Sequence, residues 1–302
     1  MQADALKREI LALKAAKQAV ILCHIYQMSE VQDVADYVGD SLGLSQEAAR
    51  TDANLIIFCG VHFMAETAAI LNPGKKVLIP DPKAGCPMAD MIDPAKLQAL
   101  KDQHPGAPVL CYVNSTAAVK ALSDICVTSA NALKIARQIP EKKIILVPDK
   151  YLGIFVQRQV DKEVILYNGY CPTHMKISPR LIDEARAAHP KAVVMVHPEC
   201  LPEVQDKADH VLSTGQMCDM AAKLPAKEFI IGTEEGITYT LSKRVPGKHF
   251  YPIQPMPLCP NMKKITLAKV LTSLQDEVHV VTVAPDMAKA AGKSIRRMLE
   301  MS

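Results

Sequence analysis

Apolar segments of four or five residues recur along the chain, separated by longer stretches whose polar and apolar residues have helical spacing. In chain order, these segments are 19–23, 55–59, 76–79, 109–113, 143–147, 163–166, 193–196, 228–231 and 249–253. Continuous apolar segments that alternate with helical stretches are typical of parallel strands covered by helices on both faces. The pattern therefore predicts strand and helix units, with three main strands in each third of the chain.

Short apolar stretches before Ser41, Ser129 and Thr214 predict a fourth strand in each unit. The fold class that we expect is α/β, with three pseudo-threefold-related three-layer αβα sandwich domains whose parallel sheets surround a central active site. The predicted domains are residues 1–85 together with 261–302, residues 86–170, and residues 171–260. In the C-terminal tail, residues 280–283 and 286–299 predict a strand and a basic helix that pack back on the first domain.

A cysteine followed by proline occurs once in each unit, at intervals of 85 and 88 residues. These cysteines are Cys86, Cys171 and Cys259. Seven residues after each of them comes a residue that favours helix N-caps; the three are Asp93, Ser178 and Thr266. A role in the core would not require cysteine at the same point of all three units. The recurrence therefore indicates a threefold repeat and a metal site that takes one thiolate from each domain.

Polar side chains directly follow the first apolar segment of each unit. They are His24 and Tyr26, Tyr112 and Asn114, and His197 and Glu199. In open parallel sheets, ligands bind outside the carboxyl ends of the strands. We therefore expect these side chains to line one central cavity together with the three thiols.

The hydroxyl residues Ser41, Ser129 and Thr214 come just before helical stretches, where side chains and free backbone N–H groups suit carboxylate or phosphate groups. Each candidate also has a simpler interpretation. A serine or threonine before a helix is commonly an N-cap, and a lone buried histidine is commonly a satisfied core residue. Most of the six cysteines outside the repeat lie in apolar surroundings, as small core side chains do.

Composition narrows the classes of function. The chain has 302 residues and a formal net charge of +3, which does not favour a nucleic acid or an anionic membrane as partner. No apolar run approaches the roughly 20 residues of a spanning helix, and residues 1–17 lack the core of a signal peptide. We therefore expect a cytoplasmic protein. Its nine cysteines predict reduced thiols rather than a disulfide framework.

Thiolate ligands favour zinc, copper(I) or an iron–sulfur cluster. Structural zinc is usually held by four ligands that include closely spaced pairs such as Cys-x-x-Cys, and the sequence contains no such pair. Three thiolates on a four-iron cluster would leave one iron without a protein ligand. Such an iron can act as a Lewis acid on a bound substrate.

Several segments together resemble the quinolinate synthase family, and the resemblance extends over essentially the full chain. They are His24-x-Tyr26-Gln27, Gly39-Asp40-Ser41, Gly85-Cys86-Pro87, Cys111-Tyr112-Val113-Asn114, Thr128-Ser129, Gly169-x-Cys171-x-x-His174, His197-Pro198-Glu199-Cys200, Ser213-Thr214-Gly215 and Cys259-Pro260. The resemblance implies condensation of iminoaspartate with dihydroxyacetone phosphate to quinolinate, phosphate and water in de novo NAD biosynthesis. It also implies a 4Fe-4S cluster, and functional coupling to the L-aspartate oxidase or aspartate dehydrogenase that supplies iminoaspartate.

The resemblance assigns roles to individual residues. Its implied metal ligands are Cys86, Cys171 and Cys259, and its implied catalytic residues are Tyr26, His197 and Glu199. The implied substrate-binding residues are His24, Asp40, Ser41, Tyr112, Asn114, Ser129, His174, His197, Glu199, Ser213 and Thr214. Tyr26 and Glu199 match the acid–base pair of the family.

Two other classes of function stay open at this point. Diphthamide-type enzymes and the diphosphate reductase of isoprenoid synthesis also place three cysteines on pseudo-threefold domains, which makes a radical or reductive enzyme the alternative. The radical reaction would require cleavage of S-adenosylmethionine, and the reductive one would require electron delivery. A non-catalytic iron–sulfur or zinc carrier is the third hypothesis, and it leaves the convergent His, Tyr and Glu residues unexplained.

Overall fold

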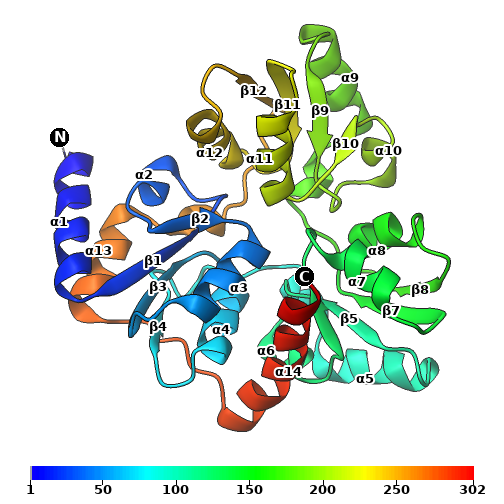
Figure 1. Cartoon of the computed structure of the whole chain (residues 1–302), viewed down its shortest axis with the longest axis horizontal. Helices are drawn as coiled ribbons and strands as arrows, with labels where there is room; N and C mark the ends of the chain where they lie inside the picture. The colour runs from blue at the N-terminus through cyan, green and yellow to red at the C-terminus, as the bar shows by residue number, and fades with distance from the viewer. Residues whose placement is uncertain (1) are drawn as a thin grey trace.

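The computed structural model describes residues 2–302, which form three lobes around a common centre (Figure 1). Each lobe contains a four-stranded sheet in which every pairing of neighbouring strands is parallel. The strand order is the same in all three sheets, with the second strand of each unit at one edge and the fourth at the other. Helices flank the sheets, so the expected α/β fold of three sandwiches is confirmed.

The first lobe follows the predicted pattern closely. Its elements are α1 (Gln2–Ala16), β1 (Ala19–His24), α2 (Ser29–Gln32), β2 (Tyr37–Gly39), α3 (Ser41–Arg50), β3 (Leu55–Cys59), α4 (His62–Leu71) and β4 (Lys76–Leu78). All five residues of the central strand β3 are buried. A parallel strand with a helix layer on each face has no solvated side, which explains why β3 is apolar at every position.

The second lobe repeats this arrangement. Its elements are η1 (Ala89–Met91), α5 (Pro94–Gln103), β5 (Val109–Tyr112), α6 (Ala117–Ala121), β6 (Ile125–Val127), α7 (Ala132–Gln138), β7 (Lys143–Val147), α8 (Lys150–Gln157) and β8 (Glu163–Leu166), where η denotes a 3₁₀ helix. Strands β5, β6 and β7 are buried almost throughout.

The third lobe has the same order of strands. Its elements are η2 (His174–Lys176), α9 (Pro179–Ala188), β9 (Val193–Val196), α10 (Pro202–Gln205), β10 (His210–Val211), α11 (Thr214–Lys223), β11 (Glu228–Gly232), α12 (Ile237–Arg244) and β12 (His249–Pro252). Each short stretch predicted as a fourth strand is therefore an edge strand, as β2, β6 and β10 show.

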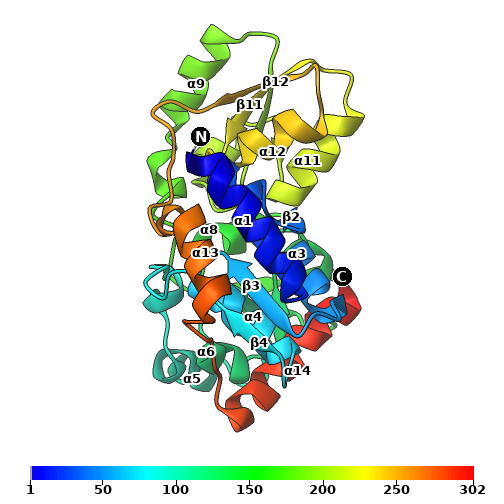
Figure 2. The same cartoon turned by 90° about the vertical axis from the view of Figure 1, so that its left-hand side faces the viewer.

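The C-terminal tail contains η3 (Met262–Lys264), α13 (Leu267–Asp276) and α14 (Pro285–Met301). Helix α13 packs beside α1 and against β3, as expected for a tail that returns to the first lobe (Figure 2). The predicted strand at 280–283 is wrong, because only an isolated bridge joins Val280 to Leu78. Helix α14 lies mainly against α6 and β6 of the second lobe and also contacts α4. The tail thus joins two lobes, whereas the sequence placed it on one.

Each sheet lies within one predicted domain range, and the domain boundaries themselves stay a prediction. The predicted caps Asp93, Ser178 and Thr266 accept hydrogen bonds from the third residue beyond them and begin α5, α9 and α13. Each Cys-Pro therefore lies at the same point of its unit, before a 3₁₀ turn and a capped helix.

Within residues 2–302, no helix combines the length and apolar composition needed to cross a membrane.

Candidate active site and metal centre

Strand ends from all three lobes surround a cavity of about 180 Å³ near the centre of the molecule. The predicted site residues that line it are His24, Tyr26, Asp40, Ser41, Cys86, Tyr112, Asn114, Ser129, Cys171, His174, His197, Glu199, Thr214 and Cys259. Among the predicted residues, all of which lie in the described part of the chain, Ser213 alone is absent from this lining. The fold therefore brings together residues that are more than 200 positions apart.

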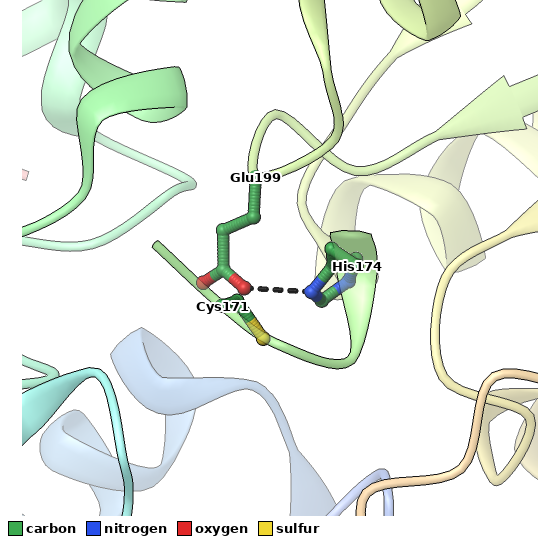
Figure 3. A group of neighbouring side chains, drawn as sticks. All are labelled: Cys171, His174 and Glu199. Atoms are coloured by element: carbon green, nitrogen blue, oxygen red, sulfur yellow. Dashed lines mark ion pairs between the residues drawn. The ribbon is translucent and has the colours of Figure 1, made fainter. Parts of the chain in front are cut away.

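Glu199 contacts side chains from two other segments of the cavity, and it is 3% exposed. The hydroxyl of Tyr112 donates to Oε1 at 2.5 Å, and Nδ1 of His174 lies 2.7 Å from Oε2 (Figure 3). Burial alone would raise the pKa of Glu199, but the neighbouring His174 ring and the hydrogen bond from Tyr112 hold it below its usual value. Glu199 is therefore a carboxylate at neutral pH.

Tyr26 is joined to Glu199 through two intermediate side chains. Its hydroxyl lies 2.5 Å from Oγ1 of Thr233, and the same Oγ1 lies 2.8 Å from Nε2 of His174. Nδ1 of His174 then faces Glu199. Burial, aided by the charge of Glu199, raises the pKa of Tyr26 well above its usual value, so the phenol keeps its proton. Two hydrogen bonds and the close contact between Nδ1 of His174 and Glu199 thus connect a neutral phenol to a carboxylate.

His24 and His197 occupy equivalent positions in the first and third lobes. Burial lowers the pKa of each to about 3, so both rings are neutral at physiological pH. Nδ1 of each ring accepts a backbone N–H two residues later, from Tyr26 at 3.2 Å and from Glu199 at 3.3 Å. A neutral imidazole that accepts at Nδ1 carries its proton on Nε2. Both rings therefore present an N–H donor, and that of His197 lies 3.1 Å from the Ser129 hydroxyl.

Of the predicted hydroxyl residues, Ser41, Ser129 and Thr214 are not helix caps. Asp40 caps α3, and Ser213 caps α11 in a reciprocal capping box with Gln216. Among the described residues, the hydroxyls of Ser41 and Thr214 have no hydrogen-bond partner in the protein. They are consequently free to bind a ligand in the cavity, whereas the hydroxyl of Ser213 is occupied by α11 and by Asp40, 3.3 Å away.

Asn114, like Ser41 and Thr214, has a polar atom in the cavity that lacks a hydrogen-bond partner in the described chain. Its Oδ1 is buried and accepts no hydrogen bond from any residue in the described chain. A buried polar atom without a partner costs about 1–3 kcal/mol. This cost indicates that the side chain is arranged to receive a donor from a bound molecule.

The three repeated cysteines are the thiols that line the cavity, and each is partly exposed. The other six, all in the described chain, are buried elsewhere. Burial raises the pKa of Cys86 to about 12, with smaller contributions from Glu199 and Cys259, and it also raises that of Cys171. Sγ of Cys171 lies within 4.8 Å of ligand atoms of His174 and Glu199. Three convergent thiols at the edge of a polar cavity are a donor set that fits an iron–sulfur cluster.

Sequence reasoning missed three residues of the third lobe and its tail, namely Thr233, Glu234 and Lys263. Glu234 is fully buried, accepts the backbone N–H of Cys259 at 3.1 Å and lies 3.0 Å from Nζ of Lys263. Lys263 in turn donates to the carbonyl of Tyr26 at 2.7 Å. Thr233 and Glu234 directly follow β11, another strand of the unit that begins with β9. Polar residues at the end of this strand, as well as at the end of β9, were the sequence signal that could have identified them.

Fold and site together define a class of protein: a three-lobed α/β protein in which the thiols of three Cys-Pro turns line one cavity with buried polar side chains. A family model described as quinolinate synthetase A protein matches residues 8–300. The chain belongs to this family, which confirms the resemblance seen in the sequence. It is 51% identical over 301 residues to a quinolinate synthase of Dehalococcoides mccartyi (strain CBDB1), with complete coverage of both chains. It is 52% identical over 294 residues to a quinolinate synthase of Thermodesulfovibrio yellowstonii, which covers 97% of each chain.

Proposed function

We propose that the protein condenses iminoaspartate with dihydroxyacetone phosphate and releases quinolinate, phosphate and water, as the quinolinate synthase step of NAD biosynthesis. The observation that carries this proposal is that one thiol from each lobe lines the same cavity as Tyr26 and Glu199. A carrier of a cluster or of zinc would not need a buried carboxylate connected to a buried phenol through Thr233 and His174. The convergence of binding groups and acid–base groups therefore favours an enzyme.

Cys86, Cys171 and Cys259 would hold a 4Fe-4S cluster through three irons. When bound, the cluster supplies an iron without a protein ligand, which can act as a Lewis acid in the loss of water. Glu234 supports this site from outside, because it accepts the backbone N–H of Cys259 and so fixes the third ligand loop.

The proton transfers of the reaction would fall to the chain's own side chains. Glu199 is ionised and can accept a proton from a substrate carbon, while Tyr26 is neutral and can donate one to a leaving oxygen. His174 and Thr233 lie between them and can return the proton from one to the other. The two groups can thus be reset between the successive steps that a condensation with loss of phosphate and water requires.

Substrate binding would use groups that have no other partner. Nε2–H of His24, the hydroxyls of Ser41 and Thr214, and Oδ1 of Asn114 all belong to the cavity lining. N–H and O–H donors suit carboxylate and phosphate oxygens, and the amide oxygen suits an imine or hydroxyl donor. We place the reaction in the cytoplasm, coupled to an L-aspartate oxidase or aspartate dehydrogenase that forms iminoaspartate.

The decisive experiment measures quinolinate from anaerobically purified protein supplied with iron, sulfide and the two substrates. Quinolinate at many equivalents per chain is the expected result. Cluster-loaded protein that forms no quinolinate would contradict the proposal. Cleavage of S-adenosylmethionine, or consumption of electrons from a reductant, would instead favour the radical or reductive alternative.

Cluster loading should depend on pH. The cavity thiols have raised pKa values, and only thiolates bind iron, so loading must release protons. Because lower proton concentration favours that release, the affinity for the cluster should rise between pH 7 and pH 9. Iron and sulfide bound after reconstitution at each pH measure this effect. Equal occupancy at limiting iron across that range would contradict the raised pKa values.

A small dicarboxylate that carries a thiol or hydroxyl should inhibit the enzyme. Such a molecule can bind the iron that lacks a protein ligand while its carboxylates meet the free hydroxyls of the cavity. Mössbauer spectra of the loaded protein should then show a shift of one iron site in four. The same dicarboxylate without the thiol or hydroxyl is the control. Inhibition without any spectral change would place the inhibitor away from the iron.

A further inference from the structure

A second hollow lies at the surface where the second and third lobes meet. We call it the seam groove, and it has a volume of about 510 Å³. The second lobe contributes α7 and α8, and the third lobe contributes the turn between β10 and α11 (Figure 1). The residues that line it are Ser129, Ala130, Leu133, Lys134, Arg137, Gln138, Phe155, Gln159, Pro198, Val211, Leu212, Ser213 and Gln216.

Ser129 separates the seam groove from the central cavity and lines both spaces. There the Ser129 hydroxyl lies 3.1 Å from Nε2 of His197. Ser213 lines the groove as well, and its hydroxyl bonds to Asp40 of the cavity. Among the described cysteines, none lines the groove. The groove therefore approaches the cavity on the side of its hydroxyl groups rather than on the side of its thiols.

All three seams between lobes contain buried polar contacts. Between the first and second lobes, Lys120 is fully buried and donates to Thr67 at 2.9 Å. Between the third and first lobes, the buried side chain of Gln32 donates to the carbonyl of Gly236 at 3.1 Å. The second and third lobes are joined by the buried hydrogen bond from Tyr112 to Glu199 and, at the surface, by Arg158 and Asp206, whose side chains are 45% and 61% exposed. An exposed ion pair of this kind contributes at most about 1 kcal/mol.

The charge of the seam groove is positive. Lys134 and Arg137 are exposed and lie three residues apart on α7, so they share one face of the helix. Among the described residues that line the groove, none is aspartate or glutamate. In the other two units the equivalent positions carry Gln46 and Ala49, and Asp219 and Ala222. The pair is thus a feature of this seam and not of the repeat.

The central cavity offers anions neutral donors rather than a positive charge. Its lining includes Asp40, Glu199 and Glu234, of which Glu234 is paired with Lys263, against the single cation Lys176 among the described residues that line it. Both proposed substrates are anions, so the lining itself gives them little long-range electrostatic attraction. Cationic groups at the entrance can supply this attraction, and such steering raises association rates by about 10-fold to 1000-fold.

We propose that the seam groove is the entry site for the anionic substrates, and that Lys134 and Arg137 bind the phosphate of the phosphate-bearing substrate before it passes Ser129. This inference rests on the proposed function for the identity of the substrate. The groove itself recognises any small phosphate monoester that can reach the hydroxyl side of the cavity.

The test reverses both charges, in the double variant Lys134→Glu, Arg137→Glu. At low ionic strength, kcat/KM for dihydroxyacetone phosphate should fall about 10-fold while kcat stays unchanged, because the chemistry does not involve these residues. At about 1 M salt, where the Debye length is about 3 Å, the difference from the parent should disappear. In the milder variant Lys134→Gln, Arg137→Gln, kcat/KM should lie between the values of the parent and the charge-reversed variant. This neutral variant serves as the test if the charge-reversed protein fails to fold.

The matched control is Lys293→Glu, Arg296→Glu on α14, an exposed lysine and arginine with the same spacing and the same change in charge. Isothermal titration calorimetry of dihydroxyacetone phosphate with anaerobic protein measures the dissociation constant without turnover. This constant should rise about 5-fold in the groove variant alone. The proposal would be overturned if the parent and the groove variant had equal dissociation constants, or if the control variant lost as much affinity as the groove variant. Tight binding with the expected groove effect but no quinolinate would refute the proposed function and leave the entry site established.

Discussion

Anaerobically reconstituted Cys171→Ala protein is expected to hold no 4Fe-4S cluster and to form no measurable quinolinate. Each of the three Cys-Pro turns supplies one thiol to the cavity, so the loss of Cys171 would remove a third of the proposed ligand set, and no other described cysteine lines the site to replace it. The same result is expected for Cys86→Ala and Cys259→Ala. Iron and sulfide per chain, together with the brown absorbance of thiolate-bound iron, measure the outcome.

The control for this series is Cys218→Ala on α11. Cys218 is buried but does not line the cavity, so its variant should keep the cluster and the activity. Cys23→Ser and Cys59→Ser should also keep the absorbance, because both residues lie in the strands of the first sheet. Four irons per chain in the Cys171→Ala protein would show that the assignment of the ligands is wrong.

Glu199→Gln and Tyr26→Phe are each expected to lower turnover by about 100-fold or more, the usual scale for loss of a positioned base or acid. Glutamine keeps the hydrogen-bonding shape of Glu199 but cannot accept a proton as the carboxylate does. Phenylalanine removes the hydroxyl that contacts Thr233 and leaves the ring in place. The fold, the cluster spectrum and substrate binding should be nearly unchanged. Anaerobic single-turnover mixing with both substrates separates the chemical step from binding.

Tyr167→Phe provides a matched control for the tyrosine variant. Its hydroxyl also makes a hydrogen bond, to the carbonyl of Met91 at 2.7 Å, but the residue lies outside the cavity lining. Turnover should therefore stay at the parent value. His24→Ala and Ser129→Ala should weaken substrate affinity more than they slow the bound complex. Glu199→Gln protein that turns over at the parent rate would refute the acid–base role.

Much of the fold follows from local sequence. The apolar segments predicted as the main strands correspond to strands of the three sheets, because a parallel strand covered on both faces must be apolar throughout. The caps Asp93, Ser178 and Thr266 were also predictable, since a capping side chain bonds within three residues of itself. Residues 280–283 have the apolar character of a strand but form only one bridge, because a strand needs a partner edge that the sequence alone cannot supply.

The repeat allowed the site to be predicted before its geometry was known. One cysteine per unit and polar residues after the first strand of each unit indicate convergence, because equivalent positions of like domains face a common axis. The structure brings all of these residues to one cavity. Local sequence could not distinguish a capping hydroxyl from a free one: Asp40 and Ser213 take the caps, which leaves Ser41 and Thr214 free.

Tertiary structure alone decided which groups touch. Thr233 joins Tyr26 to His174 although these residues come from the first lobe, the third sheet and the loop before α9, and no spacing along the chain predicts that contact. The ionisation of Glu199 is likewise set by neighbours from two other segments, Tyr112 and His174. The sequence by itself determined most of the secondary structure, the repeat and which cysteines recur in it, since these depend on local patterns. The connection from Tyr26 to Glu199, the placement of α14 and the groove between the second and third lobes depend on how three lobes pack, which is a long-range property.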